Sequence, residues 1–375
     1  MRLMTFVHDG LTCKKSFISA TKRTFIAATL ACVSIIPAMA QQTQPVLPPP
    51  PPVVSTVPAN GDVNPYGVAF VPAHVTAGLT LHPYDILVSN YNDAQNLQGL
   101  GTTIVRVDSK GQPSLFYQGS SSGMSAALGV VQRGFVFAGN LPTFDGTSAT
   151  AQAGSLSILD GNGNVVNHVV NSTFINGPWG MAIMDTGTSA HVFVSNVLSG
   201  TITRLDVTFS GGNSVVINKM VEVGSGFNHR SDPAALELGP SGLDYNSATD
   251  TLYIASSSDN AIYALKGVRS AKSSLGSGEL VYQDYIHLHG PLQLATAPNG
   301  DLLVANSDGS NVDPNQPSEI VEFTTAGQFV SQFSIDVNNG GAFGVALQGI
   351  GSLAFRIAAV DDDQNVLRTW TEIVH

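Results

Sequence analysis

A short motif that recurs six times is the feature that most constrains the fold of this chain. Each copy contains a Pro-x-Gly step, or a degenerate version of it, that leads into a short apolar run. Successive copies lie roughly 50 to 60 residues apart, slightly more than the usual period of a propeller blade. Repetition at this distance indicates similar units that cover one another's apolar faces. The copies lie at residues 65–70, 127–130, 178–183, 240–243, 291–295 and 342–346.

Each unit contains further strand patterns. The motif is followed by a run of apolar residues that ends in small polar residues, as at 86–90, 135–140 and 302–306. Continuous apolar runs are typical of strands that are covered on both faces. A third run alternates more clearly, for example at 202–206, and a fourth follows, for example at 329–333. Four strands per unit, with no helical pattern between units, predict an all-β fold: a six-bladed β-propeller of four-stranded antiparallel blades.

The last unit is one strand short. After Trp370 only five residues remain, too few for a fourth strand. A blade with an unpaired edge exposes backbone N–H and C=O groups, so such rings tend to close with a strand from the other end of the chain. We therefore expect residues near Val53 to Val57 to pair with the last unit.

The first 40 residues have the pattern of an export signal, with a basic region, an apolar stretch at 25–36 and a small-x-small cleavage site at 38–40. The sequence thus predicts a signal peptide at 1–40, a Pro-rich linker at 41–60 that includes the closing strand, and a propeller at 61–375. We expect a periplasmic or secreted protein without an integral membrane segment after cleavage. The alternatives are an uncleaved anchor and a lipoprotein modified at Cys32.

Composition supports one all-β domain and excludes several kinds of site. The chain has 38 Gly, 20 Pro and only 11% charged residues, as suits many strands joined by tight turns. Both cysteines, Cys13 and Cys32, precede the cleavage site, so the mature chain has no disulfide and no thiolate site. Cleavage changes the charged residues from 16 basic and 27 acidic to 11 and 26, a net charge of about −15. A nucleic-acid partner is therefore not expected.

The repeats resemble NHL-repeat propellers and, more distantly, the gluconolactonase and senescence-marker-protein group. This resemblance implies a metal-dependent hydrolase with acidic or amide ligands at the start of the innermost strands, including the middle position of steps like Pro-x-Gly. None of the residues at that position here supplies an anionic oxygen. They suggest instead an apolar rim that stacks on a ligand, or else packing between blades. The rim candidates are Tyr66, Trp179, Ser241, Leu292 and Phe343, with Leu128 at the same position of the second unit.

A second candidate set is formed by the residues that end the second apolar run of five units. Their side-chain oxygens are able to bind a hard cation such as Ca²⁺ if they converge around the axis. The alternative is structural, because Asn and Asp tolerate turn geometry and bond to nearby backbone. The candidate metal ligands are Asn90, Asn140, Asn196, Asn306 and Asp361. Asp361, Asp362 and Asp363 together are expected to form a solvated loop between strands.

The third candidate set is based on histidine. His229 and Arg230 lie in a long loop before the fourth unit, together with Asp232. His287 and His289 flank Leu288, and on an extended segment both imidazoles lie on one side, a spacing that suits Zn²⁺ or proton transfer. Some lyases that resemble NHL propellers hold zinc with several histidines and an arginine. The candidate catalytic residues are His229, His289 and Arg230.

Two functions remain open. The first is a binding or scaffold module that presents the mouth of its channel to a protein, a glycan or a small molecule. The second is a metal-dependent hydrolase or lyase that uses His229, His289 or Asp361. No phosphate-binding loop, serine-hydrolase elbow or His-Glu-x-x-His helix is present in the sequence.

Overall fold

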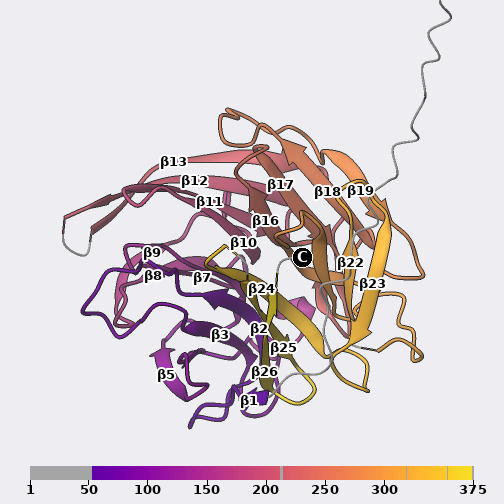
Figure 1. Ribbon diagram of the computed structural model, residues 1–375, viewed down its shortest axis with the longest axis horizontal. Helices are drawn as coiled ribbons and strands as arrows, with labels where there is room; N and C mark the ends of the chain where they lie inside the picture. Colours follow the sequence, from indigo (N-terminus) through magenta and orange to yellow (C-terminus); the bar gives the residue numbers. More distant parts are fainter. Residues whose placement is uncertain (1–52, 212–213, 318, 353, 374–375) are drawn as a thin grey trace, which may run out of the picture. The chain divides into compact units, whose positions relative to one another are not determined.

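Six β-sheets of four antiparallel strands surround a central axis in the computed structural model (Figure 1). The structure describes residues 53–373 except 212–213, 318 and 353. The expected signal peptide and the linker residues before Val53 lie outside this part of the chain. Within it, no helix has the length and apolar character needed to cross a membrane.

The first five blades follow the chain order from the axis outward. They are β2–β5 (Val63–Phe70, Ile86–Asn92, Thr103–Val107, Pro113–Gln118), β6–β9 (Met124–Val130, Val136–Asn140, Ser155–Leu159, Val165–Val169), β10–β13 (Pro178–Asp185, Ser189–Asn196, Thr201–Ser210, Ser214–Ser225), β16–β19 (Pro240–Asn246, Thr251–Ser256, Ala261–Lys266, Glu279–Gln283) and β20–β23 (Pro291–Thr296, Leu302–Asn306, Glu319–Phe323, Phe329–Ser334). A 3₁₀ turn, η1 (Ser148–Thr150), and a hairpin, β14–β15 (Arg230–Asp232, Leu236–Leu238), lie outside the blades. The predicted fold class is confirmed.

The sixth blade combines the two ends of the described part of the chain. It consists of β24 (Ala342–Ile350), β25 (Ala354–Asp361), β26 (Val366–Ile373) and β1 (Val53–Ser55). β1 is antiparallel to β26, where a closing strand was expected, and Val53 lies opposite Arg368. Thr56 extends this contact, because its N–H and hydroxyl both donate to the Asn365 carbonyl oxygen, at 3.0 and 2.9 Å.

The Pro-x-Gly motif marks an irregularity at the start of each inner strand. The register with the second strand shifts there in all six blades. Proline fits this position because it lies at a strand end and offers no N–H to the ladder. Glycine is required because the blades converge on the axis. A Cβ at Gly180 would overlap the Ser241 carbonyl oxygen of the next blade, and one at Gly344 would overlap the Tyr66 carbonyl oxygen.

Serine hydroxyls join neighbouring blades next to this motif. Ser89 accepts from the Gly67 N–H at 3.0 Å and donates to the Ser125 carbonyl oxygen of the second blade at 2.8 Å. Ser195 connects the third blade to the fourth in the same way, with a 2.5 Å bond to the Ser241 carbonyl oxygen. These buried bonds satisfy carbonyl groups that the irregular register leaves without a ladder partner.

Candidate functional site

A cavity of about 350 Å³ lies at the end of the channel where the inner strands begin. Residues from five blades and from the β14–β15 hairpin line it. Convergence at this end follows from the topology, because each inner strand starts there and each second strand ends there. The mouth of the channel is therefore the place where the repeated motif brings side chains together.

The hairpin covers one side of the cavity. Ala234 and Glu237 of the hairpin region line the cavity, and Leu236 is buried in the apolar cluster below it. The Gln98 side chain from the first blade donates to the Ala234 carbonyl oxygen at 2.9 Å. Leu236 has a φ of +61°, a left-handed conformation that is uncommon for a leucine and is held here by burial. The hairpin is thus attached to the ring by the buried side chain of Leu236 and by the bond to Ala234 at its tip.

Aromatic side chains form the floor of the cavity. Tyr66 lies with its ring centroid 5.4 Å from that of Trp179 and 4.6 Å from that of Phe343, and Tyr91 packs against Tyr66 and Trp179. Leu292 also lines the cavity. Of the rim candidates, Trp179 is only 1% and Phe343 8% exposed, so these rings both pack between blades and close the cavity from below.

Ser241, the remaining rim candidate, does not line the cavity. It is fully buried, and its hydroxyl donates to the carbonyl oxygens of Gly239 and Pro291 at 3.0 and 3.3 Å. A small residue at this position allows the fourth and fifth blades to approach each other closely. Leu128, at the same position of the second blade, faces the cavity at the other end of the inner strands.

Some buried polar atoms on residues that line the cavity have no hydrogen-bond partner within the described part of the chain. They include Nε1 of Trp179 and Oδ1 of Asn64 and of Asn92. The amide of Asn92 is oriented by its Nδ2, which donates to Oδ1 of Asn96 at 2.7 Å, so its oxygen is the atom left unpaired. An unsatisfied buried polar group costs about 1–3 kcal/mol, so a bound group that reaches one of these atoms and bonds to it recovers part of that cost.

Four carboxyl side chains also line the cavity, those of Glu237, Asp308, Asp362 and Asp363. Burial, and then the charges of Asp363 and Asp361, raise the pKa of Asp362 to about 8. Burial and the charges of neighbouring aspartates raise the pKa of Asp363 to about 6. Burial also raises the pKa of Glu237. The charges of neighbouring aspartates add to the effect of burial for Asp362 and Asp363, and no cationic side chain among the lining residues offsets them.

The expectation that Asp361, Asp362 and Asp363 form a solvated loop is wrong for two of them. Asp361 is fully buried and accepts from Nη2 and Nε of Arg368 at 2.6 and 3.0 Å. Asp362 is half-buried in the cavity wall, and only Asp363 is largely exposed. The turn between β25 and β26 points inward because the preceding strand ends at the mouth of the channel.

The five candidate metal ligands occupy equivalent positions, each at the end of a second strand. The side chains of the four asparagines hold the backbone that leads into an inner strand, whereas Asp361 accepts from Arg368. Nδ2 of Asn90 donates to the Thr56 carbonyl oxygen and Nδ2 of Asn196 to that of Phe174, both at 3.0 Å. Nδ2 of Asn140 and Asn306 make corresponding bonds. These are the contacts of the structural alternative, and a metal-binding role remains a prediction.

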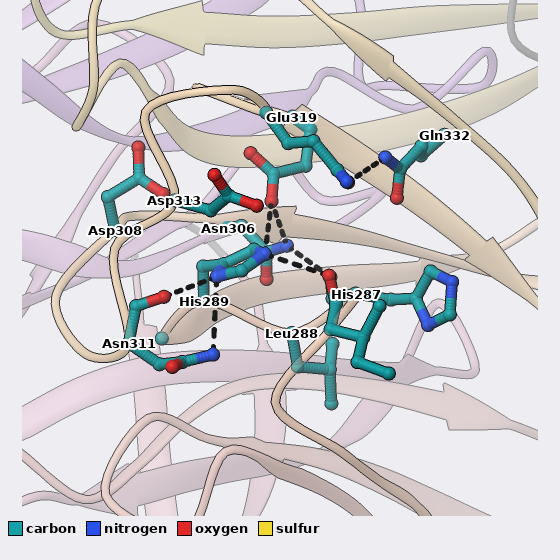
Figure 2. A network of polar contacts seen from close by, with 12 residues as sticks. His287, Leu288, His289, Asn306, Asp308, Asn311, Asp313, Glu319 and Gln332 are labelled. Atoms are coloured by element: carbon teal, nitrogen blue, oxygen red, sulfur yellow. Dashed lines mark hydrogen bonds and ion pairs between the residues drawn. The ribbon is translucent and has the colours of Figure 1, made fainter.

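The histidine candidates lie in separate surroundings. His229 and Arg230 are exposed, and Arg230 pairs with Asp232 at 2.9 Å. His287 bonds to Asp284 at 2.6 Å, whereas His289 is buried among other partners, and Figure 2 shows the two rings directed to different sides. The segment is bent rather than extended, so the expectation of two imidazoles on one side is wrong.

His289 belongs to a buried polar network next to the cavity (Figure 2). Its Nδ1 lies 2.5 Å from the Asn311 carbonyl oxygen, and its Nε2 lies 3.1 Å from that of Ile286 and 3.4 Å from Oε1 of Glu319. Burial, and then the charge of Asp308, raise the pKa of Glu319. The network secures the segment that carries Asp308 and Val312 into the cavity wall.

Sequence reasoning missed several residues of the cavity. Asn64 and Asn92 adjoin the recognised runs, and Glu237 lies in a hairpin that interrupts the repeat. The signals available were the insertion before the fourth Pro-x-Gly step and the position of Asn64 directly before Pro65. Neither reveals which side chains face the axis.

Comparisons with known proteins show the fold. No family model and no curated protein matches the chain. Among solved structures, a luciferin-regenerating enzyme is 11% identical to this chain with a TM-score of 0.51. The match covers 87% of this chain and 95% of the chain of that enzyme. A gluconolactonase from Xanthomonas campestris is 12% identical with a TM-score of 0.50, and covers 88% and 99%. A virginiamycin B lyase from Staphylococcus aureus is 13% identical with a TM-score of 0.45, and covers 85% and 88%. The expected likeness to gluconolactonase-type propellers is confirmed for the fold.

Proposed function

We propose that this protein is an exported binding module that holds a small molecule in the cavity at the mouth of its channel. The observation that supports this proposal most directly is that Trp179, Asn64 and Asn92, which all line one cavity, each have a buried polar atom without a hydrogen-bond partner. A volume of about 350 Å³ lies at the lower end of the range for small-molecule sites. An aromatic floor with a few polar groups suits such a ligand.

Export is part of this proposal. It is supported by the basic, apolar and small-residue pattern of residues 1–40. A binding role at the channel mouth fits a protein of the periplasm or of the extracellular medium. The test is the N-terminal sequence of the mature protein, which begins at Gln41 if the signal is cleaved after Ala40.

Trp179 provides a direct test of binding. The chain has two tryptophans, and Trp370→Phe leaves Trp179 as the only reporter. A fragment set of neutral, cationic and anionic small molecules is titrated against this variant, with tryptophan fluorescence and ligand-observed NMR as readouts. We expect hits that change the Trp179 emission and that lose about tenfold in affinity in Asn92→Ala, since an acceptor is removed.

The matched control is Asn218→Ala, on the outer strand β13 and outside the cavity lining. It is expected to leave the affinities unchanged. Hits that bind equally well to Asn92→Ala and to wild type, or a fragment set without any hit, contradict binding in this cavity.

The second candidate, a metal-dependent hydrolase or lyase, is examined by metal analysis of chelator-washed protein. A stoichiometric ion that disappears in the His229→Ala, His289→Ala double variant would replace the binding-module proposal. Among the described residues, no three His, Cys, Asp or Glu side chains lie close enough together to hold a metal ion.

A further inference from the structure

We propose that the ligand of the channel-mouth cavity is a small organic cation, an ammonium group on an apolar skeleton with a hydrogen-bond acceptor elsewhere on the molecule. This inference rests on the proposed binding function and specifies its ligand class. Three features of the cavity lead to it: its charge, its unpaired acceptors and its floor.

The charge of the lining is of one sign. Glu237, Asp308, Asp362 and Asp363 line the cavity, and the lining includes no Lys, Arg or His. Arg368, in the same blade as Asp362 and Asp363, is already paired with Asp361. A ligand with a positive charge compensates the carboxyl groups of Glu237, Asp362 and Asp363, which have no cationic side chain beside them in the lining, and an anionic ligand is repelled.

The unpaired atoms determine which polar groups the ligand carries. Oδ1 of Asn64 and Oδ1 of Asn92 are acceptors, and both residues are more than nine-tenths buried. A ligand group that reaches either oxygen has to offer an N–H or O–H donor, and an ammonium group has several donors and no acceptor. Nε1 of Trp179 is a donor without a partner, so the ligand also carries an acceptor, such as a hydroxyl oxygen.

The floor favours an organic cation over a metal ion. Tyr66, Trp179 and Phe343 present aromatic and apolar atoms below the carboxyl groups. Such a surface gains free energy when it covers an apolar skeleton, and it attracts a nearby cation through the ring quadrupole. A bare divalent ion gains neither and requires several oxygens at close range.

The raised pKa values provide an independent readout. Tyr66, Asp361 and Asp363 face Asp362, and Asp336 and Asp308 act on Asp363. A bound cation lowers the pKa of Asp362, so a fraction of a proton is released on binding near pH 7. Calorimetric titrations in two buffers of different ionisation enthalpy measure that release. A neutral ligand produces no such release through charge.

Three probes of nearly equal shape separate the outcomes: tyramine, which is cationic, 4-(2-hydroxyethyl)phenol, which is neutral, and 4-hydroxyphenylacetate, which is anionic. We expect tyramine to bind about tenfold or more tightly than the neutral probe, and the anion not to bind. In the Asp362→Asn, Asp363→Asn double variant we expect tyramine to lose that advantage. Glu279→Gln, an exposed carboxyl on the outer strand β19, is the matched control and leaves it unchanged.

The results that overturn the inference differ from those that overturn the proposed function. The inference of a cationic ligand is wrong if the neutral probe binds as tightly as tyramine or more tightly, or if the double variant does not weaken tyramine binding. Either result leaves the cavity as a binding site. If calcium ions from calcium chloride bind through Asp362 and Asp363 and tyramine does not bind, the inference of an organic ligand is wrong. If none of these three probes binds but neutral molecules of the fragment set do, the cation inference fails and the proposed binding function remains.

Discussion

Three consecutive aspartates of this chain have three different environments. Asp361 is fully buried against Arg368, Asp362 is half-buried in the cavity wall, and Asp363 is largely exposed at its edge. Identical side chains in adjacent positions thus differ in pKa because burial and neighbouring charge differ. A sequence pattern cannot assign these environments, since the direction of each side chain depends on a tight turn between two strands. This explains why the candidate site was predicted less well than the fold.

Asp362 makes stability depend on pH in a direction that can be measured. Its folded-state pKa is about 8, against an ordinary value of 3.8. As the pH rises from about 4 to 8, the unfolded chain loses this proton while the folded protein keeps it, so the free energy of unfolding falls across that window. We expect Asp362→Asn to flatten this fall and to be more stable than wild type at pH 8.

Urea unfolding at several pH values between 5 and 9 provides the comparison. Asp145→Asn is a suitable control, because hydrogen bonds from Thr150 and Thr147 lower the pKa of Asp145 and its titration lies below the window. Parallel pH curves for wild type and Asp362→Asn would show that Asp362 is ionised in the folded protein.

The inner strands show what the repeated motif could and could not predict at the level of elements. Each Pro-x-Gly copy lies in an inner strand, and each apolar run that follows is a second strand, because continuous apolar runs need cover on both faces. The β14–β15 hairpin was not predicted, since it belongs to no repeat and its strands have only three residues each. Elements that occur once lack the internal comparison that made the blades recognisable.

The serine bonds between blades predict a measurable contribution to stability. In Ser89→Ala the Gly67 N–H and the Ser125 carbonyl oxygen both lose a buried partner. We expect the free energy of unfolding to fall by about 1–3 kcal/mol. Ser114→Ala, at an exposed position of the outer strand β5, is expected to change it by less than about 0.5 kcal/mol. A Ser89→Ala protein as stable as Ser114→Ala would mean that the blades are held by apolar packing alone.

At the level of the whole molecule, the number of blades and their order followed from counting units in the sequence. The count succeeded because a blade cannot bury both its faces alone and every blade must therefore carry the same apolar pattern. The contents of the channel mouth did not follow, because they depend on loops and on a hairpin that vary from blade to blade. The fold thus follows from what the units share and the site from where they differ.

Closure of the ring gives a prediction for the whole molecule. A chain that begins at Asn60 lacks β1 and Thr56, and β26 then has an unpaired edge. We expect its melting temperature in calorimetry to be clearly lower than that of a chain that begins at Pro50, which keeps β1. Equal melting temperatures would show that the ring is stable without its closing strand.

The pairing of β1 with β26 has one more consequence. The first and last strands are neighbours at the outer side of the same blade, with Val53 opposite Arg368. A short peptide that joined them would make the backbone a continuous circle, which could be opened afresh between any two blades, for instance between β9 and β10, without interrupting a sheet. The two ends of the chain can therefore be moved to any boundary between two blades, and we expect circularly permuted versions of this protein to fold to the same ring.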